Sequence, residues 1–155
     1  MNHIAHDGYT LTRDIAACPA HVFALWADPE KKRAWFAEDG APTRDHSADF
    51  RVGGTETGRF VVEDGPGAGE HQNVTHYLDI APDEHIVMAY TMAWNGRIHS
   101  ASLVTVSFED LNGGTRLTYD EKMTLIGRSD GAEMRRHGWR ALLDRLERQL
   151  AEDTR

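Results

Sequence analysis

The chain has 155 residues, a length that suits one domain with a substantial hydrophobic core. Its 25 acidic residues outnumber its 17 basic residues, and the formal net charge is −8. Because no run of Lys or Arg forms a basic stripe, we expect no nucleic-acid partner and no attraction to anionic lipid.

The first predicted element is a half-buried strand. Residues 9–17, YTLTRDIAA, alternate apolar and polar side chains, which is typical of a strand with one face on a core. Leu11, Arg13 and Ile15 share one side of this strand. We therefore expect an apolar face that one arginine interrupts.

Two short helices are predicted next. Pro19 suits the first turn of a helix, and the residues after it place an apolar stripe at helical spacing. This stripe consists of Val22, Phe23 and Trp26. Asp28, before Pro29, has the character of a helix N-cap. The segment DPEKKRAWF, residues 28–36, is therefore expected to form a second helix directly after the first.

Six further strands are predicted in the middle of the chain, where the pattern changes to period two. They are SADFRV (47–52), GTETGRFVV (54–62), NVTHYLDIA (73–81), EHIVMAYTMAW (84–94), HSASLVTVSFED (99–110) and GTRLTYDEKMT (114–124). Short turn signals, including the Asn-Gly pairs at 95 and 112, separate most of them, and a longer loop covers 63–72. Consecutive strands joined by hairpins predict an antiparallel meander.

The strand faces differ in side-chain size. Met88, Tyr90, Met92 and Trp94 alternate on one face of their strand, opposite smaller side chains. In the last strand Glu121 shares the register of the apolar residues, which are Leu117, Tyr119 and Met123. We therefore expect a carboxylate in line with the apolar face of the sheet.

A long amphipathic helix is predicted from about Asp130 to the end. Its stripe consists of Trp139, Leu142, Leu143, Leu146 and Leu150. The first half of this helix is less apolar, since it carries Met134, His137 and Gly138 in place of branched aliphatic residues. We expect that half to face a void rather than a packed core.

The location of the protein is predicted from three observations. Cys18 is the only cysteine, so no internal disulfide forms. The first residues, MNHIAHDGY, lack the apolar stretch of a signal peptide, and no run approaches the ~20 apolar residues of a membrane span. We therefore expect one domain over residues 1–155 in the cytoplasm, without stable membrane insertion.

The order of strand, two short helices, meander and long helix resembles the SRPBCC superfamily, also called START-like or birch-pollen-allergen-like. More narrowly, the chain resembles short bacterial proteins of the family named after the activator of the heat-shock-protein-90 ATPase. The segments that carry this likeness are RDIAACPAHVFALWADPEKKRAWF, DFRVGG, YLDIAPDEHIVMAY, VTVSFEDLNGGTRLTY and GWRALLDRLERQL. The resemblance implies an α+β helix-grip fold, with a curved antiparallel sheet of about seven strands around the long helix.

The resemblance also implies a hydrophobic cavity between the sheet and the last helix. Flexible Met side chains and broad aromatic rings suit the wall of such a cavity. The predicted ligand-binding residues are Trp35, Phe36, His76, Met88, Tyr90, Met92, Trp94, Glu121, Met123 and Met134. We expect the charges of residues 28–32 to face water while Trp35 and Phe36 cap one end of the cavity. The alternative is a solid core, which we favour for Trp26 and Trp139 and leave open for Trp35, Tyr90 and Trp94.

A catalytic site is a second hypothesis. His76 shares a strand register with Val74 and Leu78, so it points inward if that side faces the core, as Glu121 does from another strand. Two such groups could serve acid–base chemistry. The alternative is a structural polar pair, or a register that differs by one residue. No HExxH motif, paired Cys, GxSxG elbow or phosphate-binding loop occurs, so we expect no metal and no cofactor.

Three functions remain open from the sequence. The first is binding of a small hydrophobic or aromatic molecule, lipid-like or polyketide-like, in the cavity. Another is an enzyme of the cyclase or hydrolase type that uses His76 and Glu121, because related helix-grip proteins include such enzymes. The third is a co-chaperone-like protein partner, implied by the family name alone. An exposed strand edge makes a homodimer plausible.

Overall fold

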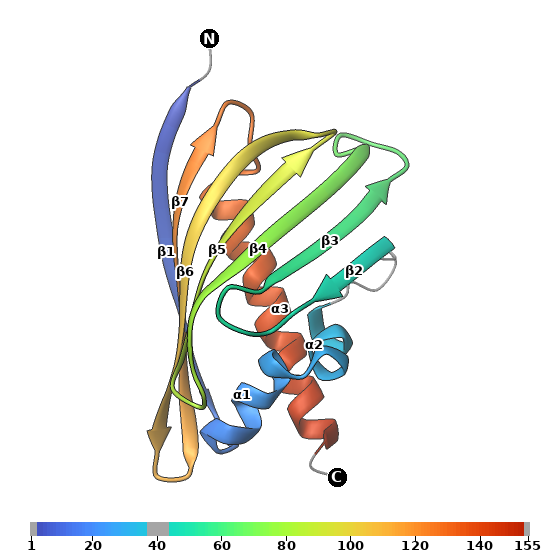
Figure 1. Ribbon diagram of the computed structural model, residues 1–155. Helices are drawn as coiled ribbons and strands as arrows, with labels where there is room; N and C mark the ends of the chain where they lie inside the picture. The colour runs from blue at the N-terminus through green and yellow to red at the C-terminus, as the bar shows by residue number, and fades with distance from the viewer. Residues whose placement is uncertain (1–2, 37–43, 154–155) are drawn as a thin grey trace.

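The computed structural model describes residues 3–36 and 44–153. Its elements are β1 (Ile4–Ile15), α1 (Pro19–Ala27), α2 (Pro29–Phe36), β2 (Arg44–Ala48), β3 (Thr55–Val62), β4 (Gly69–Ala81), β5 (His85–Trp94), β6 (Arg97–Leu111), β7 (Gly114–Ile126) and α3 (Gly131–Asp153). Among the described residues the strands form one antiparallel sheet in the order β1-β7-β6-β5-β4-β3-β2. Figure 1 shows this sheet curving around α3, with α1 and α2 beside the lower half of that helix. The predicted α+β helix-grip fold is confirmed.

Local sequence explains the turns and helix starts. The Asn95-Gly96 and Asn112-Gly113 pairs both adopt positive φ angles at the two hairpins of β6, a conformation that Gly and Asn tolerate best. The carboxylate of Asp28 accepts a hydrogen bond from the backbone N–H of Glu30 at 2.9 Å. The predicted N-cap of α2 is therefore confirmed.

Three strands differ from the predicted boundaries by more than two residues. The first strand starts earlier than expected, at Ile4, because its whole length pairs with β7. The strand predicted over 47–52 instead covers Arg44–Ala48, and its pairing with β3 is irregular between Arg44 and Ser47. The strand predicted over 73–81 begins earlier, at Gly69, so the expected loop over 63–72 is shorter than predicted.

The orientation of His76 was predicted wrongly. On β4, Thr75 and Tyr77 are buried, whereas His76 is exposed and Leu78 is 49% exposed. The pairing of β4 with β5 shifts between Tyr77 and Asp79, which marks a bulge at Leu78. A bulge reverses the alternation of faces, so the apolar residues of this strand do not share one side.

A cluster of large aromatic rings fills the space between α1, α2, α3 and the sheet. The indole of Trp26 lies 4.8 Å from that of Trp35 and stacks on Trp139 at 5.9 Å between ring centroids. Trp139 also stacks on Tyr119 of β7 at 4.1 Å. Trp35 is completely buried, and its Nε1–H donates to the carbonyl of Leu25 at 2.8 Å. These contacts fix α3 to both short helices and to the sheet.

We predict that Trp35→Ala lowers the free energy of unfolding by about 3–5 kcal/mol, because it leaves a large cavity among buried rings. The measurement is urea denaturation. Trp94→Ala is the matched control, since Trp94 is only half-buried at the end of β5, and its loss should be clearly smaller. Equal losses in the two variants would contradict the central position assigned to Trp35.

Candidate functional site

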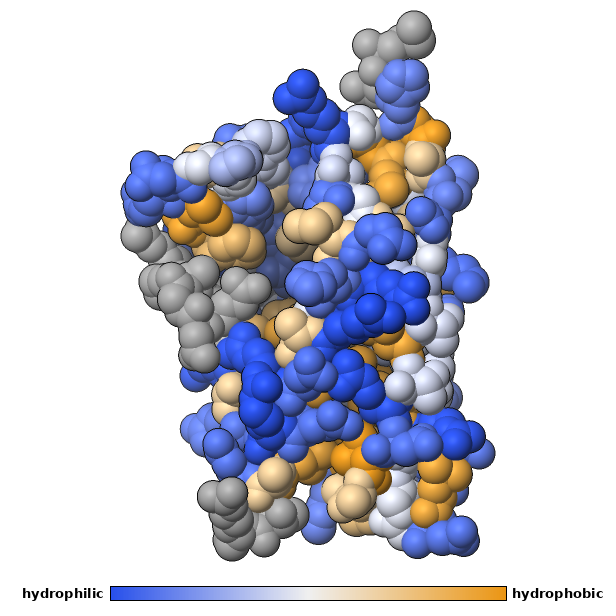
Figure 2. Space-filling view, turned by 180° about the vertical axis from the view of Figure 1, so that it is seen from behind, coloured by the Kyte–Doolittle hydropathy of each residue, from blue (hydrophilic) through white to orange (hydrophobic). Residues whose placement is uncertain are grey.

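A pocket of about 270 Å³ lies between α2, α3 and the concave face of β3, β4 and β5. Figure 2, seen from the side of α3, shows a hollow in the upper half of this face. The described residues that line the pocket are Lys32, Phe36, His46, Glu56, Gly58, Phe60, Asn73, Thr75, Met88, Tyr90, Met92, Asp130, Met134, Arg135, Gly138, Trp139 and Leu142. The less apolar first half of α3 therefore faces a void, as predicted.

The apolar part of the wall comes from several elements. Met88 and Met92 lie on the inward face of β5, and Phe60 lies at the end of β3. Met134 and Leu142 occupy α3 two turns apart, on the face that also carries Gly138. Flexible Met side chains beside rigid rings give a surface that adapts to the shape of a ligand.

A buried polar cluster centred on Glu56 forms one side of the pocket. The Glu56 carboxylate accepts hydrogen bonds from the Lys32 ammonium at 2.5 Å and from the Tyr77 hydroxyl. Nε2 of His46 lies 3.0 Å from the other carboxylate oxygen. Glu56 is 1% exposed and Lys32 5% exposed, so each charge depends on its partners for the stabilisation that water would otherwise supply.

The pKa of Glu56 reflects this environment. Burial alone would raise the pKa, but the charge of Lys32 and the hydrogen bonds from His46, Lys32 and Tyr77 overcome that effect and lower it from 4.5 to about 2. The carboxylate is therefore ionised throughout the physiological range. This cluster adds no free charge to the pocket.

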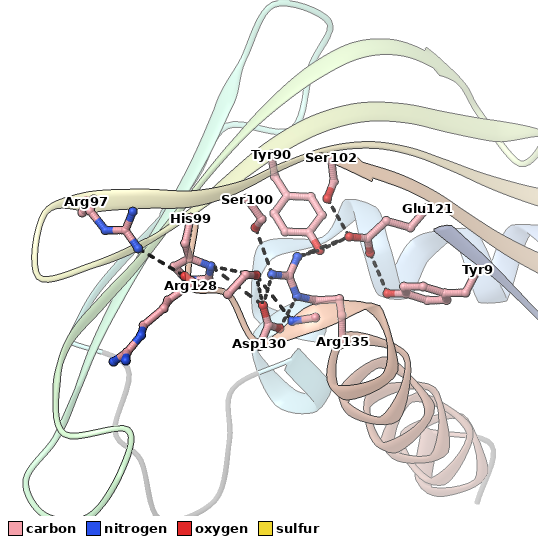
Figure 3. A network of polar contacts seen from close by, with 12 residues as sticks. Tyr9, Tyr90, Arg97, His99, Ser100, Ser102, Glu121, Arg128, Asp130 and Arg135 are labelled. Atoms are coloured by element: carbon pink, nitrogen blue, oxygen red, sulfur yellow. Dashed lines mark hydrogen bonds and ion pairs between the residues drawn. The ribbon is translucent and has the colours of Figure 1, made fainter. Parts of the chain in front are cut away.

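A second polar cluster is centred on Glu121 of β7, which is completely buried (Figure 3). Its carboxylate accepts hydrogen bonds from the side chains of Tyr9, Tyr90, Ser102, Tyr119 and Arg135 at 2.6 to 3.3 Å. Burial is the main cause that raises the pKa of each of the three tyrosines well above its usual value, and the negative charge of Glu121 adds to it. The tyrosines therefore remain hydrogen-bond donors.

Arg135 joins this cluster to the start of α3. Its guanidinium makes a two-pronged contact with the carboxylate of Asp130 at 2.7 and 2.8 Å. The same guanidinium donates to the hydroxyls of Tyr90 and Ser100, each at 2.9 Å, and to Glu121 at 3.3 Å (Figure 3). The arginine is 7% exposed, so its charge is balanced inside the protein.

Five of the ten predicted ligand-binding residues line this pocket. They are Phe36, Met88, Tyr90, Met92 and Met134. Trp35 instead packs in the aromatic cluster, Met123 is buried in the core, and Glu121 lies behind the pocket wall in its own polar cluster. Trp94 stacks against His71 at the end of the sheet.

His76 is the remaining predicted residue, and the structure separates it from Glu121. His76 is exposed on the outer face of β4, whereas Glu121 is fully enclosed on the inner side of the sheet. The acid–base pair that the sequence suggested is therefore not assembled. The physical reason is the register of β4, in which Thr75 occupies the inward position next to Glu56 of β3.

One other expectation is also corrected. Lys32 was expected to face water with its neighbours in α2, but it is buried against Glu56. Trp139, which we assigned to a solid core, is buried in the hydrophobic core and also lines the pocket.

Sequence reasoning missed the polar residues of the pocket. The strand GTETGRFVV contained a signal for Glu56, because Glu56, Gly58 and Phe60 alternate and all three line the pocket. Arg135 had no comparable signal in the sequence. A charged residue on the apolar side of a helix can be recognised as part of a buried site only when its partner is known. Among the described residues, no group of three His, Cys, Asp or Glu side chains could hold a metal ion.

Comparison with known proteins shows the family. Residues 16–151 match the family model described as Activator of Hsp90 ATPase homolog 1-like protein. The chain therefore belongs to this family, and the likeness to SRPBCC-type proteins is confirmed. A comparison with curated proteins gives no match.

Solved structures of bacterial proteins are similar over almost the whole chain. An uncharacterised protein from Rhizobium leguminosarum shares 35% identity with a TM-score of 0.87, covering 98% of this chain and 99% of its own. A protein from Rhizobium loti shares 37% identity with a TM-score of 0.84, covering 95% and 99%. A Staphylococcus aureus protein of unknown function, at 14% identity and a TM-score of 0.77 over 97% of both chains, shares the fold.

Within residues 3–36 and 44–153, no helix is both long and apolar enough to span a bilayer.

We predict a pH dependence of stability from Glu56. Because folding lowers its pKa from 4.5 to about 2, the stabilisation is complete above the unfolded pKa and is lost as the pH falls through the folded one. The shift corresponds to about 3 kcal/mol. In urea denaturation the wild-type protein should lose about 3 kcal/mol more than Glu56→Gln between about pH 5 and about pH 2.

The matched control for this prediction is Glu109→Gln, which alters an exposed carboxylate on β6. Its pH profile should follow that of the wild-type protein. Parallel profiles for wild type and Glu56→Gln would show that the Lys32 and Glu56 pair is not the acid-sensitive element.

Proposed function

We propose that this protein binds a small, mainly apolar or aromatic molecule in the pocket between the sheet and α3. The observation that carries the proposal is a pocket whose walls combine Met and aromatic side chains with a few enclosed polar groups. This composition is typical of small-molecule sites. Membership of the family supports a ligand-binding role and names no ligand.

The size of the pocket limits the ligand. Its volume of about 270 Å³ lies near the lower end of the range of ~300–1,000 Å³ that is usual for small-molecule sites. A compound of one to three fused or linked rings suits this volume. Of the two classes expected from sequence, a small aromatic or polyketide-like molecule is therefore favoured over a long lipid chain.

The other candidate functions have less support. An enzyme that uses His76 and Glu121 is not favoured, because the two side chains lie on opposite sides of the sheet. A co-chaperone-like role rests on the description of the family alone. The cytoplasmic location and the homodimer stay predictions. For the homodimer, β1 at the edge of the sheet is a strand with which a second copy could pair.

Gly138 gives a direct test of the binding proposal. A Cβ atom added at this position would meet no atom of the neighbouring elements within 4 Å, and the residue lines the pocket from α3. We predict that Gly138→Leu weakens binding of the neutral dye N-phenyl-1-naphthylamine about tenfold or more by occupying the pocket. The same change should raise the free energy of unfolding by about 0.5–1 kcal/mol, because Gly is a poor helix residue.

Dye fluorescence titration and urea denaturation measure the two effects separately. Ala141→Leu is the matched control, since Ala141 is an exposed position of the same helix outside the pocket. Its dye affinity should equal that of the wild-type protein. Unchanged affinity in Gly138→Leu would place the dye elsewhere and end the proposal.

A further inference from the structure

We infer that Asn73 and Thr75 of β4 are the polar anchors of the pocket, and that they select an uncharged ligand carrying a hydroxyl or carbonyl oxygen. This inference rests on the proposed binding function and specifies its chemistry. It concerns the middle of the pocket floor, between the Glu56 cluster and the Glu121 cluster.

The first observation is the unpartnered hydroxyl of Thr75. This residue is 7% exposed and lines the pocket. Among the described residues the Thr75 hydroxyl has no hydrogen-bond partner. The hydroxyl oxygen is also not among the unpartnered side-chain atoms that the protein encloses completely. By contrast, the unpartnered Nδ1 of His46 is completely enclosed by protein atoms. A polar group in a mainly apolar pocket is stabilised when a ligand supplies the missing hydrogen bond.

The second observation is the position of the Asn73 carboxamide beside Gly58. Its carboxamide lies against Gly58 of the neighbouring strand, and a Cβ atom at Gly58 would come within 2.6 Å of the Asn73 side-chain oxygen. Asn73 is two residues before Thr75, so both side chains point to the same face. Within the described part of the chain the carboxamide makes no hydrogen bond. The two side chains together offer donors and acceptors to one ligand oxygen.

The flanking strands place these two groups between closed charge clusters. Thr75 pairs with Glu56 on one side and with Tyr90 on the other. Glu56 is bonded to Lys32, and Tyr90 is bonded to Glu121 and Arg135. Asn73 and Thr75 are therefore neutral groups that lie between two charged clusters. The charged side chains of both clusters already have partners inside the protein.

The balance of charge argues for an uncharged ligand. The two clusters contain two cations, Lys32 and Arg135, and three carboxylates, Glu56, Glu121 and Asp130. An anionic ligand would enter a region with an excess of negative charge and would find both cations already paired. A cationic ligand would find every one of these carboxylates occupied by donors. Either charge would lose its water without gaining an unpaired group of opposite charge.

The experiment compares naphthalene, 2-naphthol, 2-naphthoate and 2-naphthylmethylammonium by isothermal titration calorimetry at neutral pH. In a pocket without free polar groups, naphthalene would bind more tightly than 2-naphthol, since a hydroxyl loses its hydration on entry. We expect 2-naphthol to bind the wild-type protein about 3- to 10-fold more tightly than naphthalene. Both charged probes should bind more weakly than 2-naphthol.

Thr75→Val tests the anchor because it removes the hydroxyl and keeps the shape of the side chain. It should weaken 2-naphthol about 3- to 10-fold, leave naphthalene unchanged and not lower the urea midpoint, since no internal hydrogen bond is lost. Asn73→Leu should reduce the preference for 2-naphthol in the same way. Thr105→Val, on the exposed face of β6, is the control and should bind all four probes like the wild type.

Each outcome has a distinct meaning. Tighter binding of naphthalene or of a charged probe than of 2-naphthol by the wild-type protein overturns the inference and leaves the binding function standing. An equal loss of all probes in Thr75→Val also overturns it, because the hydroxyl would then act through the fold. If none of the four probes binds the wild-type protein, the proposed function fails and this inference fails with it.

Discussion

The buried carboxylate of Glu121 fixes where the last helix lies on the sheet. A fully enclosed charge is stable only with several donors, and one of these donors is Arg135, on the first turns of α3. The contact holds the start of the helix at the sheet, while Trp139, one turn later, stacks on Tyr119. The helix thus meets the sheet through long side chains, and a pocket remains between the main chains of α3 and of β3, β4 and β5.

The Glu56 cluster has the corresponding effect on α2. Lys32 reaches from that helix to a carboxylate on β3, so the second short helix is held at the opposite side of the pocket floor. Both clusters neutralise their own charges, and the ligand therefore meets apolar walls and neutral polar groups. Breaking either pair would leave an uncompensated buried charge, which is far more damaging than the loss of an exposed ion pair.

Half of the predicted ligand-binding set lines the pocket, and the reason differs between residues. Met88, Tyr90 and Met92 were found because β5 alternates regularly over its inward face. His76 was misplaced because the apolar residues of β4 change sides at the bulge near Leu78, and a bulge leaves little trace in a single strand. Trp35 was expected in the pocket, but neighbouring rings from α1 and α3 enclose it completely.

The sequence by itself determined the succession of elements, the turn positions and the long amphipathic helix, because these depend on local periodicity and on residues such as Asn95 and Gly96. It also placed Glu121 on the apolar face. Only the tertiary structure decided which donors surround that carboxylate, that Lys32 is buried, and that Thr75 keeps a free hydroxyl in the pocket. Such partners come from segments up to 112 residues apart in the chain, and no local pattern records a contact between distant strands.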